Sequence, residues 1–103
     1  MDFSVIIPVY NEAGNIRPLV EEIDATVGSK KFELIYVDDC SSDETCRQIL
    51  ELRKRHPWIR LVRHHARSGQ STALRTGVKA ARAPLIVTLD GDGQNDPADI
   101  PRL

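Results

Sequence analysis

The chain has 103 residues, of which 41% are hydrophobic and 28% are charged, and its formal net charge is −1. This length and composition fit one globular domain with a modest core. A net charge so close to zero does not favour a general nucleic-acid binder, and we expect no nucleic-acid partner.

Cysteine usage and the N-terminus both indicate a cytoplasmic protein. Cys40 and Cys46 make neither a disulfide framework nor a zinc spacing, so we expect reduced thiols. Met1-Asp2 leads directly into an apolar segment, so no signal peptide is predicted, and the apolar runs are too short to span a bilayer.

The first half of the chain predicts strand, helix and strand. A strand is expected at residues 3–9, and Pro8 marks its end because proline is poorly suited to a central ladder. The next helix carries apolar residues at helical spacing: Ile16, Leu19, Val20, Ile23 and Val27. Gly28 is well placed to stop this helix, and a second strand is expected at residues 32–37.

The second half continues the alternation. Ser41 and Glu44 form a capping-box pattern that predicts the start of a helix ending at Pro57, and a third strand follows at residues 59–62. A third helix is expected at residues 71–81, before a fourth strand at 85–89. Its expected inner face holds Ala73, Leu74, Gly77, Val78 and Ala81. Gly77 there would allow close packing of helix on sheet.

The predicted fold is α/β, with a Rossmann-like parallel sheet of about four strands and helices on both faces. The strand segments are continuously apolar, which is typical of strands covered on both sides. Ligands of such sheets bind beyond the carboxyl ends of the strands. Polar residues follow three of the expected strands, at 10–12, 38–39 and 90–92, so we expect one site at that edge.

Asp90 and Asp92 carry the strongest chemical signal. They follow a buried strand, lie one residue apart and are separated by Gly91, so an extended chain would point both carboxylates the same way. Such a pair is costly to bury without a partner, and a hard cation held by oxygen ligands is the natural one.

The other two clusters are open to more than one interpretation. Tyr10 and Glu12 could offer an aromatic face and a carboxylate to a base and ribose, or simply follow a strand that Pro8 ends. Of Asp38 and Asp39, one could contact a base or ribose while the other braces the loop, or both could cap the next helix.

Basic residues gather in a stretch without acids. No Asp or Glu lies between Glu51 and Asp90, where we find Arg53, Lys54, Arg55, Arg60, Arg63, Arg67, Arg75, Lys79 and Arg82. This is either a solvated basic face or an anion-facing surface. Gly69 could present backbone N–H groups to a phosphate with Arg67 adding charge, or be an ordinary cap. For His64 and His65, structural or surface roles are favoured over metal binding.

Several segments together resemble one family. They are Val5 to Glu12, Tyr36 to Thr45, Gly69-Gln70-Ser71 with Ala73, Leu74 and Gly77, and Leu89 to Pro97. In this order they resemble the family 2 glycosyltransferases with the GT-A fold, and within them the dolichol-phosphate mannosyltransferase and polyprenyl-phosphate glycosyltransferase type. The sequence would then be the N-terminal, nucleotide-binding half of a GT-A fold.

The resemblance implies a UDP- or GDP-linked sugar donor, Mg²⁺ or Mn²⁺, and transfer of the sugar to a polyprenyl or dolichyl phosphate. The matching nucleotide-binding positions are Pro8, Tyr10, Glu12, Asp38, Asp39 and Asp90, and the matching metal positions are Asp90, Asp92 and Gln94. The basic stretch could attract the lipid phosphate or an anionic membrane surface, which would put the full-length protein at the cytoplasmic face of a membrane.

Two positions depart from the family's pattern. Cys40 stands where a glycine is usual, so that turn is expected to differ in conformation, and Arg67-Ser68-Gly69 replaces the more usual asparagine-x-glycine. The chain stops at Leu103 in what resembles the start of a helix. We therefore expect residues 1–103 to be the nucleotide-sugar-binding part of a longer catalytic domain, with no catalytic residue inside it and no transfer by it alone.

Two other classes were weighed against the glycosyltransferase. A non-catalytic nucleotide-binding or receiver-like module would suit the length and the Asp38-Asp39 pair, but a receiver has its acidic pair after the first strand. A haloacid-dehalogenase-type phosphatase also has Asp-x-Asp after a strand, with the first Asp as nucleophile, but usually on its first strand. Here the motif follows the fourth.

Overall fold

The computed structural model describes residues 1–27 and 30–90, which form four strands and three helices in strict alternation. They are β1 (Phe3–Val9), α1 (Ala13–Val27), β2 (Phe32–Asp38), α2 (Thr45–Arg55), β3 (Ile59–Arg63), α3 (Gln70–Ala80) and β4 (Leu85–Thr88). The expected order is confirmed. The stop expected at Gly28 lies outside the described residues.

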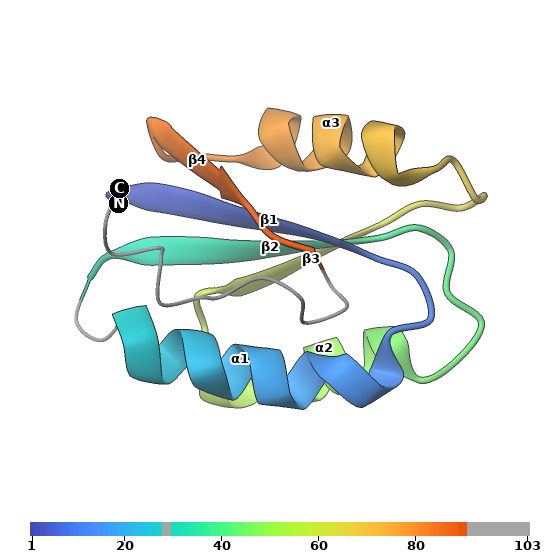
Figure 1. The fold of residues 1–103 in the computed structure, drawn as a ribbon, viewed down its shortest axis with the longest axis horizontal. Helices are drawn as coiled ribbons and strands as arrows, with labels where there is room; N and C mark the ends of the chain where they lie inside the picture. The colour runs from blue at the N-terminus through green and yellow to red at the C-terminus, as the bar shows by residue number, and fades with distance from the viewer. Residues whose placement is uncertain (28–29, 91–103) are drawn as a thin grey trace.

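The elements form three layers. The sheet has the strand order β3-β2-β1-β4, and each neighbouring pair is parallel. Helices α1 and α2 cover one face of this sheet and α3 covers the other (Figure 1). The predicted α/β fold with helices on both faces is therefore confirmed.

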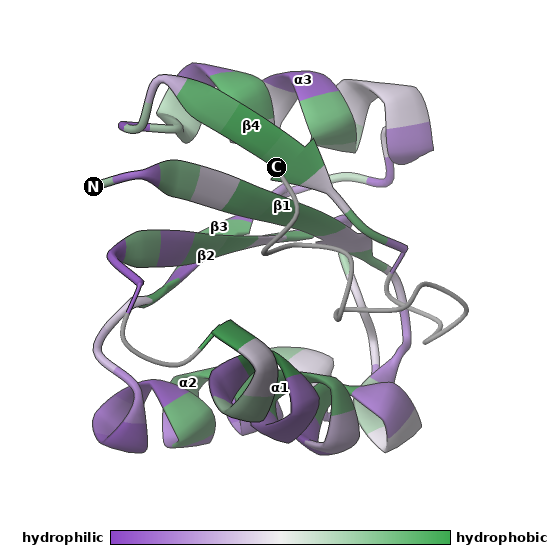
Figure 2. Ribbon diagram, turned by 60° about the vertical axis from the view of Figure 1, so that its left-hand side comes forward, coloured by the Kyte–Doolittle hydropathy of each residue, from purple (hydrophilic) through white to green (hydrophobic). Residues whose placement is uncertain are grey.

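Side chains of the central strand alternate between two cores. Val5, Ile7 and Val9 of β1 pack with the buried faces of α1 and α2, whereas Ile6 packs toward α3. Because both faces of β1 and β2 are covered, every residue of these strands is buried. Figure 2 shows the largely hydrophobic strands between helices whose outer sides are hydrophilic.

Gly77 brings α3 close to the sheet, as predicted. A Cβ atom at this position would lie 2.3 Å from Cγ2 of Ile6, so only glycine fits without a shift. The inner face of the helix is narrower than expected, because Val78 is 46% exposed and points away from the sheet. Successive residues of a helix point in directions about 100° apart, so Val78 does not share the sheet-facing direction of Gly77.

The fourth strand is not covered on both faces, contrary to expectation. Leu85 and Ile86 are exposed, because β4 lies at the edge of the sheet and pairs only with β1 in the described structure. That pairing ends opposite Ile6, before it reaches Pro8. Pro8 is therefore tolerated inside the central strand, since its missing N–H falls where the β4 ladder has stopped.

The second helix begins later than the capping-box pattern predicted. Its first residue is Thr45, and its N-cap residue Glu44 makes no side-chain capping bond. The carboxylate of Asp43 instead accepts the N–H of Thr45 at 2.9 Å. Ser41 does not act as a cap, because its hydroxyl oxygen accepts the N–H of Asn11 at 2.9 Å while the hydroxyl donates to Asp38.

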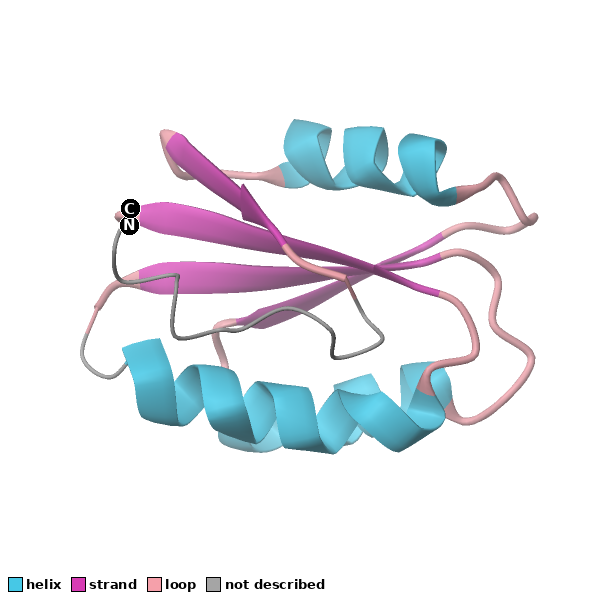
Figure 3. Ribbon diagram, in the orientation of Figure 1, coloured by secondary structure: helices cyan, strands magenta, loops and turns pink. Residues whose placement is uncertain are grey.

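The loops that leave β1, β2 and β3 gather at one end of the sheet (Figure 3). This is the edge at which the sequence placed the site. None of the helices formed by residues 1–27 and 30–90 has the length and apolar character needed to cross a membrane.

Candidate functional site

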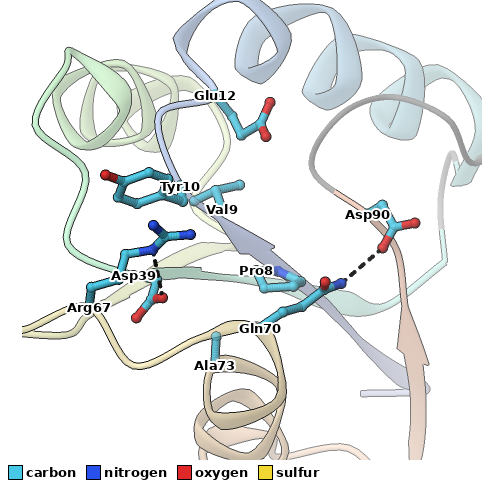
Figure 4. Close-up of a pocket in the computed structure, with 9 residues that line it drawn as sticks. All are labelled: Pro8, Val9, Tyr10, Glu12, Asp39, Arg67, Gln70, Ala73 and Asp90. Atoms are coloured by element: carbon cyan, nitrogen blue, oxygen red, sulfur yellow. Dashed lines mark hydrogen bonds and ion pairs between the residues drawn. The ribbon is translucent and has the colours of Figure 1, made fainter.

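A cavity of about 280 Å³ lies at the carboxyl edge of the sheet (Figure 4). Its lining residues are Pro8, Val9, Tyr10, Glu12, Asp39, Arg67, Gln70, Ala73 and Asp90. They come from the ends of β1, β2 and β4 and from the start of α3. The expected convergence of separate loops on one site is therefore present.

Most of the sequence-predicted site residues meet in this cavity. Pro8, Tyr10, Glu12, Asp39 and Asp90 all line it. Asp38 does not, and Asp92 and Gln94 lie outside the described residues.

Asp39 is the most firmly held acid of the cavity. Its Oδ1 accepts bonds from His64 Nδ1 at 2.9 Å and from the N–H of Ser68 at 2.8 Å, and its Oδ2 accepts the N–H of Gly69 at 2.8 Å. Burial works to raise the pKa of the Asp39 carboxyl, but these three bonds and the charge of His64 together hold the pKa below its usual value. Asp39 therefore enters the cavity as a fixed negative charge.

The same bonds decide what the start of α3 does. The N–H groups of Ser68 and Gly69, which were candidates for a phosphate, are bonded to the Asp39 carboxylate. The anion held at this helix N-terminus is thus one of the protein's own side chains. His64 has a structural role, as favoured from sequence, because it links Asp39 to Thr76 of α3.

Asp38 braces the loop instead of facing the cavity. It is fully buried, and its carboxylate accepts bonds from the hydroxyl and N–H of Ser41. The Cys46 thiol also donates to Asp38 at 3.2 Å. Burial is the main cause that raises the pKa of this thiol to about 11, and the neighbouring Asp38 carboxylate is the second. One aspartate of the pair thus faces the site while the other holds the turn.

The loop after β1 is fixed by the loop after β2. Asn11 adopts a left-handed backbone with φ of 51°, and its Oδ1 accepts the N–H of Ser42 at 2.9 Å. The N–H of Glu12 donates to Thr45 Oγ1 at 3.0 Å, and Glu12 Oε2 accepts a bond from Asn15 at 2.9 Å. These contacts set where Tyr10 and Glu12 enter the cavity.

Cys40 keeps the turn that a glycine would make. Its φ is 69°, in the left-handed region that side chains rarely adopt. Glycine adopts this region freely, so the conformation at Cys40 is one that the family's usual glycine could also take. The cysteine has been accommodated in the glycine-like turn at a cost in backbone strain.

Two cavity residues, Arg67 and Gln70, were not among the predicted nucleotide- and metal-binding positions. The guanidinium of Arg67 lies over the ring of Tyr10, 3.5 Å from its centroid, and Gln70 Nε2 donates to Asp90 Oδ1 at 3.3 Å. Arg67 lies in the loop after β3, which has no apolar periodicity, and Gln70 is the first residue of α3. The sequence signals were the charge of Arg67 beside Gly69 and, for Gln70, the Gly69-Gln70-Ser71 segment of the resemblance.

Part of the acid-free basic stretch is neutralised by acids of β2 and of the residue that follows it. Three of its arginines pair with acids on or just after that strand: Arg60 with Glu33, Arg63 with Asp38 and Arg67 with Asp39. The parallel register of β2 and β3 sets the first two pairs, because it places Arg63 opposite Asp38 and Arg60 opposite Ile35, two residues from Glu33. These three arginines each have an acidic partner, so they contribute less to the attraction of a lipid phosphate than the sequence suggested.

Asp90 is suited to a hard cation. It lies exposed at the cavity rim and offers carboxylate oxygens, which Mg²⁺ and Mn²⁺ prefer. Within residues 1–27 and 30–90, no group of three or more His, Cys, Asp or Glu side chains could hold a metal, which also excludes a centre built on His64 and His65. A cation at Asp90 therefore needs further oxygen ligands from elsewhere, such as Asp92 or a bound diphosphate.

Comparison with known proteins assigns the chain. The family model for glycosyl transferase family 2 matches residues 4–103. A dodecaprenyl-phosphate galacturonate synthase of Rhizobium johnstonii is 39% identical, with 100% of this chain aligned to 31% of the relative. A dolichol-phosphate mannosyltransferase of Pyrococcus furiosus is 37% identical, with 100% of this chain aligned to 29% of the relative. The chain thus spans about a third of the length of these relatives.

Solved structures with a bound nucleotide or nucleotide sugar share the fold. The mannosyltransferase PcManGT from Pyrobaculum calidifontis, in complex with GDP-Man and Mn²⁺, superimposes with a TM-score of 0.84 at 30% identity over 94% of this chain and 29% of its own. S. aureus TarS 1-349 in complex with UDP gives a TM-score of 0.80 at 31% identity over 89% of this chain and 28% of its own.

Proposed function

The chain belongs to glycosyl transferase family 2, and from this premise we propose that it forms the donor-binding part of a polyprenyl-phosphate glycosyltransferase. The donor is a nucleoside diphosphate sugar, and the acceptor is a polyprenyl or dolichyl phosphate. Residues 1–103 make up the nucleotide-sugar-binding part of the catalytic domain, and the acceptor groups come from elsewhere in the protein.

The observation that carries this proposal is the convergence of Tyr10, Glu12, Asp39 and Asp90 on one cavity. An aromatic ring and a fixed carboxylate stand on one side, and the start of the Asp-x-Asp motif stands on the other (Figure 4). This arrangement suits a ligand with a base at one end and a diphosphate at the other. The names of the relatives support the acceptor, since they include dodecaprenyl and dolichol phosphates.

The residues divide the work of holding the donor. Tyr10 offers a stacking face to the base, and Asp39 accepts hydrogen bonds from base or ribose N–H and O–H groups. Glu12 lies beside them as a second acceptor for the ribose. Asp90 and Asp92, with Gln94 assisting, would hold Mg²⁺ or Mn²⁺, which would neutralise charge on the diphosphate.

A bound cation supplies Lewis-acid stabilisation of the charge that develops on the leaving diphosphate. An oxygen of the acceptor phosphate bonds to the anomeric carbon of the sugar, the bond from that carbon to the diphosphate oxygen breaks, and the nucleoside diphosphate leaves with the electron pair. A polyprenyl phosphate is already an anion at neutral pH, so it needs no general base.

The test is calorimetry of the intact protein with UDP and GDP, each with and without Mn²⁺. We expect one nucleotide to bind and Mn²⁺ to strengthen the binding, with the metal effect lost in Asp92→Ala. The matched control is Asp24→Ala, which removes an exposed carboxylate of α1 remote from the cavity lining. Nucleotide binding of equal strength with and without Mn²⁺ would contradict the metal site at Asp90 and Asp92. Nucleotide binding by the intact protein without sugar transfer to a polyprenyl phosphate would indicate a binding module.

A further inference from the structure

Arg67 contacts two of the residues assigned above to the nucleoside. Its guanidinium carbon lies 3.5 Å from the centroid of the Tyr10 ring, and its Nε lies 3.4 Å from Asp39 Oδ2. Figure 4 shows the guanidinium against the ring, with its ion pair to the carboxylate. Arg67 thus uses the aromatic face and the carboxylate of the cavity at the same time.

These two contacts are the ones that a nucleobase would make. A guanidinium is flat, stacks on aromatic rings and carries N–H donors along its edge. A uracil or guanine base is also flat and carries N–H donors along one edge, and proteins bind bases by stacking on aromatic side chains and by hydrogen bonds to that edge. A base on Tyr10 that reaches Asp39 would therefore need the space and the partners that Arg67 takes.

We propose that Arg67 is an internal substitute for the nucleobase, so that a nucleotide binds by displacing its guanidinium from Tyr10 and Asp39. This rests on the proposed function, because it requires the cavity to hold a nucleoside. The displacement sets the affinity for the donor and for the nucleoside diphosphate that remains after transfer.

The contacts around Asp39 allow this exchange. His64, Ser68 and Gly69 hold the carboxylate at 2.8–2.9 Å, whereas the Arg67 pair is longer at 3.4 Å. The Arg67 side chain is also 59% exposed, so it can swing into solvent without leaving a buried charge behind. Asp39 would keep its position after Arg67 had left, ready to accept a bond from the base.

Removal of the guanidinium should therefore tighten nucleotide binding. The exposed cation–π contact with Tyr10 and the exposed ion pair with Asp39 are each weak. A variant without them should therefore bind the nucleotide about two- to tenfold more tightly, because the base no longer competes with the guanidinium. The gain should be the same for a nucleoside as for its diphosphate, because the competition is for the base alone.

The experiment measures binding of uridine, UDP, guanosine and GDP to the intact protein by calorimetry, with Mn²⁺ present. Arg67→Met keeps the aliphatic length of the side chain and removes its plane, charge and donors, and Arg67→Lys keeps only the charge. The control is Arg75→Met, which removes an exposed arginine of the same helix region that does not line the cavity. Thermal melts establish that each variant is folded.

We expect Arg67→Met to bind both the nucleoside and its diphosphate more tightly, Arg67→Lys to be intermediate, and Arg75→Met to match the unchanged protein. Weaker binding of the diphosphate with unchanged binding of the nucleoside would overturn the proposal, because Arg67 would then pair with phosphate. Equal affinities in Arg67→Met and the unchanged protein would overturn it too. If neither the unchanged protein nor any of the folded variants bound any of the four compounds, the proposed function itself would be wrong, and this inference would be wrong as well.

Discussion

His64 joins Asp39 to α3: its Nδ1 lies 2.9 Å from Asp39 Oδ1, and its Nε2 lies 2.8 Å from Thr76 Oγ1. The imidazole is only 14% exposed, so it acts inside the protein and not as a surface group. A carboxylate that determines ligand specificity must be held in its binding position before the ligand binds. His64 gives Asp39 this fixed position.

We predict that His64→Ala lowers the free energy of unfolding by about 1.5–3 kcal/mol, the usual value of a hydrogen bond to a charged group. Nucleotide affinity should fall at the same time, because Asp39 gains freedom. Urea denaturation and calorimetry measure the two effects. The neighbouring His65 is exposed, so His65→Ala is the control and should change stability by less than about 0.5 kcal/mol. Equal losses in both variants would contradict the role given to His64.

A second prediction concerns Glu33, which is buried on the α3 side of β2. Burial works to raise the pKa of its carboxyl, but bonds from the Ser4 hydroxyl, the Arg82 N–H and the Arg60 guanidinium, together with the charge of Arg60, hold the pKa below its ordinary value of 4.5. A carboxyl whose pKa is lowered by folding stabilises the folded state at pH values above its ordinary pKa. This contribution is lost as the pH falls through the lowered pKa of the folded state.

We therefore expect Glu33→Gln to be destabilised by about 3–5 kcal/mol at pH 7, because it leaves the Arg60 charge without its partner. The difference from the unchanged protein should shrink as the pH falls below 4.5, since Glu33 itself then becomes neutral. Urea midpoints measured from pH 7 to pH 3 give both curves. A difference that stayed constant over this range would show that the carboxylate charge does not stabilise the fold.

The elements that the sequence predicted well are those whose signal is local. The strands at residues 3–9 and 32–38 and the helix ending at Val27 follow from apolar runs and helical spacing, which the packed sheet then satisfies. Tyr10 and Asp39 were also found, because parallel strands always deliver their C-terminal loops to one edge.

What the sequence could not show depends on neighbours across the sheet. The exposure of β4 follows from its edge position, which no property of residues 85–88 reveals. The pairing of Arg60 with Glu33 requires the register of β2 and β3. The choice between Asp38 and Asp39 depends on how the turn after β2 folds, and Arg67 reaches Tyr10 through a loop that has no periodic pattern.

The contact between Gly77 and Ile6 leads to a third prediction. Gly77→Ala would place a Cβ 2.3 Å from Ile6 Cγ2, so the Ile6 side chain or the helix must shift. We expect a loss of about 1–3 kcal/mol from overpacking, which exceeds the gain of about 1 kcal/mol that alanine brings to a helix. Gly14→Ala is the matched control, because its added Cβ meets nothing within 4 Å and should stabilise α1. Thermal melts that placed both variants on the same side of the unchanged protein would contradict this packing.

Cys40 provides the last prediction, because it holds a left-handed backbone with φ of 69° in the loop next to Asp39. An L-residue pays about 1–2 kcal/mol for this conformation, whereas glycine adopts it freely. Glycine also loses more chain entropy on folding, which offsets part of this gain. We therefore expect Cys40→Gly to be more stable than Cys40→Ala by about 1 kcal/mol. Both variants remove the thiol and its contact with the His65 carbonyl oxygen, so their difference isolates the backbone. Urea denaturation with an unchanged slope measures it, and equal midpoints for glycine and alanine would show that the turn is not left-handed in solution.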